Sequence, residues 1–281
     1  MNYRHAFHAG NFADVVKHAL LARAIAHLRL KDTPFRVIDT HAGSGRYNLE
    51  SNEAIRGGEW RQGIARVWQA SFAPAVEPLL APYLDAIRAF NPDGQLKIYP
   101  GSPLLIRHWL RPQDRLIACE LEPVAAQTLA RQLRSDTKTK AIAIDGWTAL
   151  TAYIPPKERR GLVLIDPPFE EQGELQRLAE ALAAAHRKWA GGMILAWYPI
   201  KDMRDIARFV RDISAFKPAS ALRLELIRED TEAGRLRGSG LIAINPPWTL
   251  EAEAKLLLPE LAAKMSPEGR NSIRIESISV S

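Results

Sequence analysis

One stretch decides the fold of this chain: Gly161-Leu162-Val163-Leu164-Ile165-Asp166-Pro167-Pro168-Phe169. The apolar run from Leu162 to Ile165 is short, branched and uninterrupted, which is typical of a strand buried on both faces. The paired prolines have no N–H to donate to a sheet, so the strand must end at Asp166. The sequence therefore predicts a carboxylate and an aromatic ring at the carboxyl end of a central strand, where open α/β sheets bind their ligands.

The residues that follow this strand suit chemistry on the exocyclic amine of a nucleobase. That amine is a weak nucleophile because its lone pair is delocalised into the ring. The carboxylate of Asp166 and the carbonyl of Pro167, which the proline ring holds in place, can both accept hydrogen bonds from it. Phe169 offers a flat face for an unstacked base. The alternative interpretation is structural, a strand that ends in a proline-rich turn with a helix-capping aspartate.

Composition limits the class of protein. The chain has 281 residues, with 38 Lys and Arg against 32 Asp and Glu, a net charge of +6 and a pI near 9.5. This basic excess favours a polyanionic partner. No apolar run reaches the length of a membrane span and the first residues lack a signal-peptide core, so we expect no membrane association. The only cysteine, Cys119, can form no internal disulfide, which favours a cytoplasmic setting.

Apolar runs alternate with helical patterns along most of the chain. The predicted strands are 35–39, 115–120, 141–146, 162–165, 193–198, 222–227 and 241–244. This alternation predicts a mostly parallel, doubly wound sheet of seven strands. Glu120 and Asp145 lie at the carboxyl ends of their strands, on the same rim as Asp166. An acid in such a position is placed to bind ribose hydroxyls.

A glycine-containing turn, Thr40-His41-Ala42-Gly43-Ser44-Gly45-Arg46, directly follows the first strand. Its two glycines would let the backbone approach a ligand closely. It lacks the third glycine of the dinucleotide-binding fingerprint and the Lys-Ser/Thr of a phosphate-binding loop. By itself it is equally compatible with a plain turn.

Residues 48–97 interrupt the alternation. Two helices, 60–69 and 75–90, are predicted there, and we interpret the segment as a helical insertion. Its arginines, Arg56, Arg61 and Arg66, are candidates for contacts with a phosphate backbone or for a solvated helix face.

The first 34 residues contain a predicted helix that Asn11 caps and that ends before Thr33-Pro34. Three histidines, His5, His8 and His18, fall in this region. Their spacing matches no metal-binding template and no cysteine or acidic cluster supports one, so we expect no metal.

Together, these motifs resemble those of S-adenosylmethionine-dependent amino-methyltransferases: residues 39–45, Glu120, Asp145 and the tetrad 166–169 occur in the order that this class shows. Residues 3–18 and Tyr99-Pro100-Gly101-Ser102-Pro103 narrow the resemblance to one bacterial family, the ribosomal large subunit methyltransferase J family. The likeness covers almost the whole chain.

The resemblance implies a Rossmann-like class I methyltransferase, a single domain over residues 1–281 into which residues 48–97 are inserted. It implies that S-adenosylmethionine is the methyl donor and that no metal takes part. The substrate implied is the N6 amine of an adenine in 23S rRNA, adenine 2030 in the family, with the base flipped into the pocket. We expect a monomer.

The resemblance also implies roles for individual residues. Asp166 would be the catalytic acceptor, with Pro167 beside it and Phe169 under the target base. Tyr3 would contact the RNA. Independently of the resemblance, Arg4 and Lys17 lie near the expected pocket, and we expect them to contact phosphates around it. The implied cofactor-binding residues are His18, His41, Ser102, Glu120, Asp145, Gly146 and Asp166.

A second tetrad, Asn245-Pro246-Pro247-Trp248, could also bind an amine. It follows the last predicted strand, whereas Asp166 follows the fourth, which lies beside the first strand in the order that the family shares. We therefore expect Asp166 to be the catalytic residue.

Two other functions remain open from the sequence. One is a DNA adenine-N6 methyltransferase, although an insertion of about 50 residues is small for a target-recognition domain. The other is a non-catalytic RNA-binding protein with a degenerate methyltransferase fold, against which the intact Asp166, Glu120 and Asp145 argue.

Overall fold

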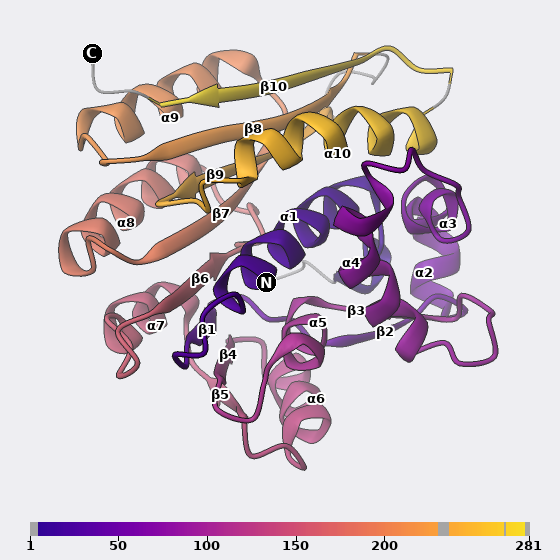
Figure 1. Cartoon of the computed structure of the whole chain (residues 1–281), viewed down its shortest axis with the longest axis horizontal. Coiled ribbons are helices and arrows are strands. Elements are labelled where there is room, and N and C mark those ends of the chain that lie inside the picture. Colours follow the sequence, from indigo (N-terminus) through magenta and orange to yellow (C-terminus); the bar gives the residue numbers. More distant parts are fainter. Residues whose placement is uncertain (1–4, 230–235, 267, 279–281) are drawn as a thin grey trace.

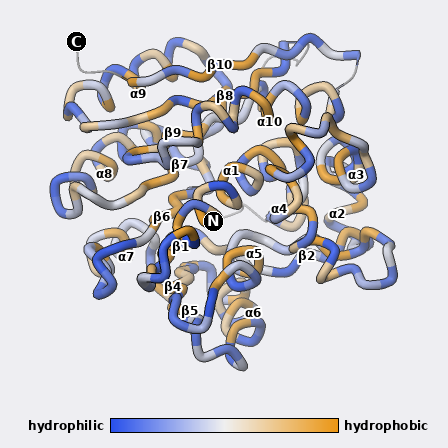
Figure 2. Tube along the Cα trace, in the orientation of Figure 1, coloured by the Kyte–Doolittle hydropathy of each residue, from blue (hydrophilic) through white to orange (hydrophobic). Residues whose placement is uncertain are grey.

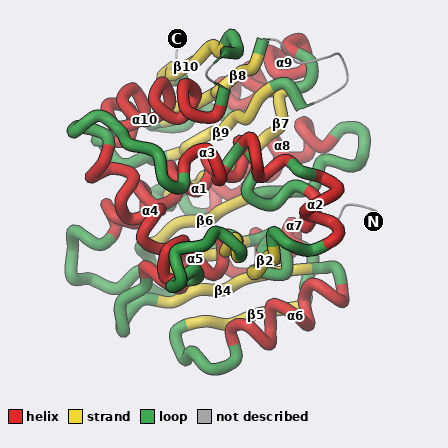
Figure 3. Tube along the Cα trace, turned by 90° about the vertical axis from the view of Figure 1, so that its right-hand side faces the viewer, coloured by secondary structure: helices red, strands yellow, loops and turns green. Residues whose placement is uncertain are grey.

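The computed structural model describes residues 5–229, 236–266 and 268–278 of the chain (Figure 1). Among them, the main sheet has eight strands in the order β10-β8-β9-β7-β6-β1-β4-β5, which Figure 3 shows from the side. Their bounds are β1 Arg36–Asp39, β4 Arg115–Glu120, β5 Thr139–Ala143, β6 Gly161–Ile165, β7 Met193–Ile200, β8 Ala221–Arg228, β9 Gly238–Ile244 and β10 Asn271–Ser277.

The mostly parallel sheet is confirmed, but the predicted number of seven strands is wrong. β5, β4, β1, β6 and β7 pair in parallel, whereas β9 pairs antiparallel with both β7 and β8, and β10 pairs antiparallel with β8. The additional strand, β10, lies at the edge and contains only two apolar residues, Ile273 and Ile275, so it does not have the pattern of a buried strand. As expected, β6 lies beside β1, which places the switch point of the sheet between them.

Helices cover both faces of the sheet (Figure 1). Strand residues alternate between the two resulting cores: Leu162 and Leu164 pack with α1, whereas Val163 and Ile165 pack on the opposite side with α8 and α9. This double burial explains the uninterrupted apolar run of β6. One face carries α1 Phe12–Leu28, α4 Glu77–Ala89, α5 Ser102–Trp109 and α10 Leu250–Met265. The other face carries α7 Gly146–Tyr153, α8 Glu174–Lys188 and α9 Met203–Ala215. Helix α6, Pro123–Leu133, packs on β4 and β5.

Helix α1 begins after Asn11, whose side-chain oxygen accepts a hydrogen bond from the N–H of Asp14 at 2.9 Å, as the capping pattern predicted. Nearly all of α1 is buried, because α4, α5, α10 and β9 surround it. Figure 2 shows apolar residues along the central strands and hydrophilic ones in many peripheral loops. Within the described residues, no helix combines the length and the apolar character needed to cross a bilayer.

The segment 48–97 leaves the sheet and returns to the same place. β2 (Arg46–Asn48) and β3 (Ile98–Pro100) form an antiparallel pair that brings its two ends together. This supports our proposal that the segment is an insertion in one domain. The predicted helix 60–69 is wrong: Gly63 separates the 3₁₀ helix η2 (Glu59–Gln62) from the short helix α3 (Ile64–Val67), and α2 (Asn52–Gly57) precedes them.

The break at Gly63 has a steric cause. The backbone of residues 10 and 11 passes so close to Gly63 that an added Cβ would lie 2.2 Å from the carbonyl oxygen of Gly10. That same oxygen accepts a hydrogen bond from the N–H of Ile64 at 2.8 Å. The segment before α1 is therefore hydrogen-bonded to the insertion, close to the residue at which α1 begins.

Gly240 of β9 allows a side chain to cross over the strand. It pairs with Tyr198 on β7 and with Glu225 on β8, and the Tyr198 hydroxyl donates to Glu225 Oε1 at 2.6 Å. An added Cβ on Gly240 would lie 2.2 Å from Cζ of the Tyr198 ring. We expect Gly240→Ala to lower the free energy of unfolding by about 1–3 kcal/mol, because buried overpacking displaces the ring.

Urea denaturation would measure this loss. Gly191→Ala is the matched control, since a Cβ added there would have no atom within 4 Å, and its effect should be within about 0.5 kcal/mol. Equal stability of the two variants would show that the Tyr198 ring does not need the space that the missing side chain of Gly240 leaves.

Candidate active site

A pocket of about 1710 Å³ lies at the carboxyl ends of the parallel strands. Ligand pockets in proteins commonly measure about 300–1,000 Å³, so this pocket has room for more than one small ligand. Nine residues that the sequence pointed to line it: His18, His41, Ser102, Glu120, Asp145, Gly146, Asp166, Pro167 and Phe169. The other two, Tyr3 and Arg4, lie outside the described residues.

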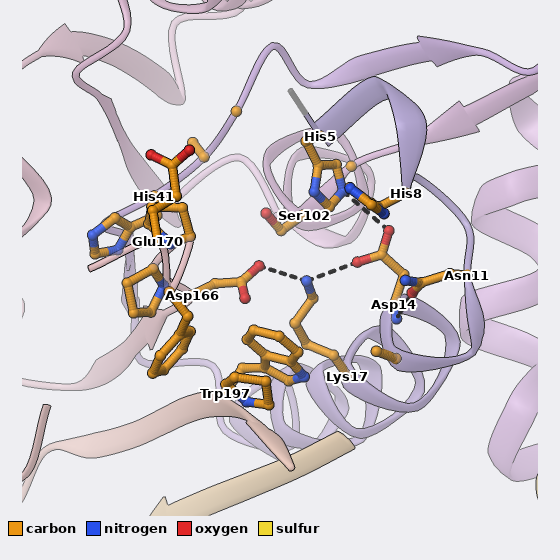
Figure 4. Close-up of a pocket in the computed structure, with 18 of the residues that line it drawn as sticks. His5, His8, Asn11, Asp14, Lys17, His41, Ser102, Asp166, Glu170 and Trp197 are labelled. Carbon is orange, nitrogen blue, oxygen red and sulfur yellow. Dashed lines mark hydrogen bonds and ion pairs between the residues drawn. The ribbon is translucent and has the colours of Figure 1, made fainter. Parts of the chain in front are cut away.

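Asp166 follows β6 and points toward helix α1 (Figure 4). The ammonium of Lys17 donates to Asp166 Oδ2 at 2.5 Å and to Asp14 Oδ1 at 2.8 Å. The other oxygen of Asp14 is 3.1 Å from Nε2 of His5 and accepts the N–H of Gly10 at 2.9 Å. A chain of charged groups therefore connects the amino-terminal segment to the end of the central strand.

The charges of this chain stabilise one another in a buried setting. Burial alone would raise the pKa of Asp14, but Lys17 and His5 hold it well below its usual value. Burial alone would lower the pKa of Lys17, but Asp14 and Asp166 raise it above its usual value. At neutral pH, the site therefore holds one ammonium between two carboxylates.

The expectation that Lys17 contacts an RNA phosphate is wrong. Its side chain is only 5% exposed, and its ammonium binds two carboxylates of the protein. The sequence analysis placed Lys17 near the start of a helix but did not predict that nearly all of this helix is buried. The sequence did contain evidence for this ion pair, because Asp14 and Lys17 are three residues apart in an otherwise largely apolar helix.

Phe169 lies against an aromatic residue that the sequence analysis did not identify. Its ring contacts the ring of Trp197, which lies on β7, in a T-shaped arrangement with the centroids 5.6 Å apart. Trp197 Nε1 donates to Ser239 Oγ at 3.0 Å, which fixes the indole. The backbone of Phe169 has a φ of 52°, an unfavourable conformation for a residue with a side chain and one that clusters at functional sites.

Glu120 connects the end of β4 to the glycine turn. Its Oε2 accepts the N–H of Gly43 at 2.8 Å and its Oε1 accepts the N–H of Glu122 at 2.8 Å. Gly43 and Gly45 have φ values of 61° and 81°, so the turn uses the left-handed backbone that glycine tolerates. The turn and the acid predicted on the same rim are therefore in direct contact.

Ser102 reaches the first strand from helix α5. Its hydroxyl donates to Asp39 Oδ2 at 2.7 Å, and Asp39 is fully buried. Burial raises the pKa of Asp39 to about 7, helped by the nearby charge of Asp166 and opposed by the bond from Ser102. Ser102 therefore lines the pocket while supporting the residue beneath it.

Two histidines of the pocket are uncharged at neutral pH. Burial lowers the pKa of His41 to about 4 and that of His18 to about 3. His41 Nδ1 is 2.8 Å from the Thr40 hydroxyl, and His18 Nδ1 is 2.7 Å from the Tyr99 hydroxyl. Neutral rings suit hydrogen bonding to a ligand without repelling a cationic one.

Asp145 caps the helix that follows β5. Its Oδ2 accepts the N–H of Thr148 at 2.8 Å, and Gly146 is the first residue of α7. An added Cβ on Gly146 would lie 2.4 Å from the carbonyl oxygen of Thr40. The chain therefore passes very close to the β1 turn at this point.

The three histidines near the amino terminus have three different partners. His5 contacts Asp14, His8 Nδ1 is 2.8 Å from Glu59 Oε1, and His18 contacts Tyr99. In the described part of the chain, no three metal-ligating side chains gather at one point.

The second tetrad lies at the opposite rim of the sheet. Because β9 is antiparallel to β7, its last residue, Ile244, pairs with Ile194 near the start of β7. Asn245 Nδ2 donates to the carbonyl oxygens of Ala190 and Gly192 at 2.7 and 2.8 Å, so the amide closes a turn. Asn245 and the residues up to 248 do not line the pocket and cannot act in it.

Comparison with known proteins gives consistent matches. The family model described as Ribosomal RNA large subunit methyltransferase D, RlmJ, matches residues 32–277. A protein of Escherichia coli (strain K12) named Ribosomal RNA large subunit methyltransferase J is 42% identical over 270 residues, 96% of this chain and 95% of that protein. A protein of the same name from Haemophilus influenzae is 38% identical over 280 residues, 99% of each.

A solved structure supports the same relationship. The crystal structure of a Legionella pneumophila protein matches with a TM-score of 0.88 and 35% identity, covering 96% of this chain and 98% of the other. The resemblance inferred from the motifs is confirmed. This chain belongs to the RlmJ family of ribosomal RNA large subunit methyltransferases and has a Rossmann-like class I methyltransferase fold.

Proposed function

We propose that the chain transfers a methyl group from S-adenosylmethionine to the N6 amine of an adenine in 23S rRNA. The observation that carries the proposal is the position of Asp166 and Phe169, together at the end of β6 in the pocket that Glu120 also lines. The names of the Escherichia coli and Haemophilus influenzae relatives support a substrate in the large-subunit rRNA.

The residues on the β1, β4 and β5 side of the pocket fit S-adenosylmethionine, which supplies the methyl group as an electrophile. Each oxygen of Glu120 accepts one backbone N–H, which leaves each a lone pair for a ribose hydroxyl. The exposed apolar side chains of Leu121 and Val124 line the same part of the pocket and suit the adenine ring. Gly43 of the glycine turn and Gly146 line the pocket beside them.

On the β6 side, the carboxylate of Asp166 has one oxygen available for a substrate. Lys17 occupies Oδ2, and among the described residues Oδ1 accepts no hydrogen bond. An amine that donates to Oδ1 and to the Pro167 carbonyl would become pyramidal, and its lone pair would then attack the methyl group. Asp166 and Pro167 would hold the amine in this form while the methyl group passes from the sulfonium to the nitrogen; S-adenosylhomocysteine would then leave, and the extra proton on the nitrogen would pass to water. Phe169, supported by Trp197, would stack against the base.

Glu120→Ala should weaken cofactor binding. Two hydroxyls would lose a charged acceptor, which is worth about 1.5–3 kcal/mol for each hydrogen bond. Calorimetry with S-adenosylhomocysteine would measure the loss, and Glu120→Gln, which keeps the shape of the side chain, would separate charge from packing. Unchanged affinity in both variants would remove Glu120 from the cofactor site.

Methyl transfer from tritiated S-adenosylmethionine tests the proposed function. We expect label in 23S rRNA from a strain that lacks the corresponding gene, and N6-methyladenosine after digestion to nucleosides and mass spectrometry. Label in DNA instead would favour a DNA methyltransferase. RNA binding without transfer to either nucleic acid would favour a non-catalytic protein.

A further inference from the structure

Three basic residues lie side by side at the pocket rim, where β7 and β8 end and β9 begins. The N–H of Arg237 donates to the carbonyl oxygen of Ile200 at 3.0 Å, and the N–H of Arg228 donates to that of Arg237 at 2.8 Å. These bonds extend the strand ladder by one step, so Lys201, Arg237 and Arg228 follow one another at the ends of three strands. The three strands, β7, β9 and β8, are neighbours in the sheet (Figure 1). We refer to these three residues as the basic row.

The basic row is on the pocket face of the sheet. Side chains two residues apart on a strand share a face. Lys201 is four residues after Trp197 and Arg237 is two residues before Ser239, and the side chains of Trp197 and Ser239 are hydrogen-bonded on the pocket face. Lys201 and Arg228 both line the pocket itself. Neighbouring strands are about 4.8 Å apart, so the three side chains start from closely spaced positions at this rim.

The described part of the chain does not neutralise the basic row. Arg223 and Arg274, in the same part of the sheet, pair with Glu225. Among the described residues, by contrast, no acidic side chain forms an ion pair with Lys201, Arg228 or Arg237. The guanidinium of Arg228 lies over the ring of Phe12, 5.2 Å from its centroid, and Nε of Arg237 is buried without an acceptor.

The part of the pocket that follows β6 carries mainly acidic side chains. Three glutamates, Glu170, Glu171 and Glu174, follow Phe169 and line the pocket, together with one arginine, Arg177. A polyanion that approached over this side would meet the carboxylates of Glu171 and Glu174. The mouth is therefore electrostatically polarised, with one side that attracts phosphates and one that repels them.

We infer that the basic row binds the phosphates next to the target nucleotide, so that the RNA strand crosses the pocket over β7, β9 and β8 and avoids the start of α8. This inference rests on the proposed function and adds the path of the substrate. Because a flipped base costs a few kcal/mol in lost stacking and pairing, phosphate contacts beside the pocket have a clear purpose.

Lys201→Gln tests the inference with little risk to folding, because Lys201 is exposed. Binding of a 23S rRNA transcript should weaken about 5-fold at about 0.1 M salt, and the slope of log affinity against log salt should fall by about 0.7. The double variant Lys201→Gln/Arg228→Gln should lose about 25-fold. Turnover at saturating RNA and affinity for S-adenosylhomocysteine should stay unchanged, whereas KM for RNA should rise.

Two controls make the result specific. Lys157→Gln removes an exposed charge just before β6, at the opposite rim of the sheet, and should leave the salt slope unchanged. Arg228→Lys keeps the charge and should keep most of the affinity, which separates the charge of Arg228 from its packing on Phe12. A loss confined to Arg228→Lys and Arg228→Gln, with none in Lys201→Gln, would overturn the inference.

The remaining outcomes separate this inference from the proposed function. If the unaltered protein methylates 23S rRNA and the basic-row variants bind it with unchanged affinity and slope, the path over β7, β9 and β8 is wrong and the function stands. Weaker S-adenosylhomocysteine binding in Lys201→Gln would assign the row to the cofactor instead. If the unaltered protein neither binds nor methylates rRNA, the function and the inference fail together.

Discussion

Replacing Asp166 by alanine should lower the rate of methyl transfer by a factor of about 100 or more and leave cofactor affinity nearly unchanged. The carboxylate acts on the amine as it becomes a nucleophile, so its loss affects the transition state more than ground-state binding. Single-turnover transfer of tritium to 23S rRNA would give the rate, and calorimetry with S-adenosylhomocysteine the affinity.

Asp212→Ala is a suitable control for this variant, because Asp212 is exposed on α9, which lies on the other face of the sheet. It should transfer methyl groups at the normal rate. If Asp166→Ala kept near-normal turnover, the amine would have to be activated by another group, and the Pro167 carbonyl would be the next candidate. A fall in cofactor affinity equal to the fall in rate would instead indicate a collapsed pocket.

The second large effect should be on stability. Lys17→Met leaves Asp14 and Asp166 without their shared cation, and breaking a buried ion pair by removing one partner costs about 3–5 kcal/mol. We therefore expect the free energy of unfolding, measured with urea, to fall by about that amount. Asp14→Asn in the same chain should restore part of it, because the more deeply buried carboxylate would then be neutral.

The pH dependence of stability follows from the two shifted groups. The pKa of Asp14 is lower in the folded chain than its ordinary 3.8, so its contribution is present above pH 3.8 and is lost as the pH falls through the folded value. The pKa of Lys17 is raised above its ordinary 10.5, so its contribution is present below pH 10.5 and is lost at higher pH. The defect of Lys17→Met should shrink in acid, where Asp14 becomes protonated. A defect that stayed constant with pH would mean that lost packing, not charge, is the cause.

The sequence was most informative where local chemistry determines the structure. The buried run before Asp166, the prolines after it and the acids at other strand ends are all local patterns, and they predicted the sheet and its functional rim. The Lys17–Asp166 contact could not be read in this way, because its partners are 149 residues apart. The break at Gly63 has the same origin, since a distant segment, and not the local sequence, prevents the helix from continuing.

The second tetrad shows a different limit. A motif of residue types contains no information on the direction of the strand before it. Asn245 follows an antiparallel strand and therefore lies at the far rim. It does so although its backbone φ is positive, 49°, as is the φ of Phe169, 52°. The order and direction of the strands distinguish the two tetrads, and the family resemblance implied the order alone.

The central position of α1 has a consequence for the order of events during synthesis. The ribosome makes α1 early, yet Lys17 must wait for Asp166, and Arg23 must wait for Glu253, which is 230 residues later. Until β9 and α10 emerge from the ribosome, the largely apolar helix α1 lacks two of the elements that bury it. The fold can therefore close only when almost the whole chain is available, and a nascent chain that stalls before α10 would expose a surface prone to aggregation.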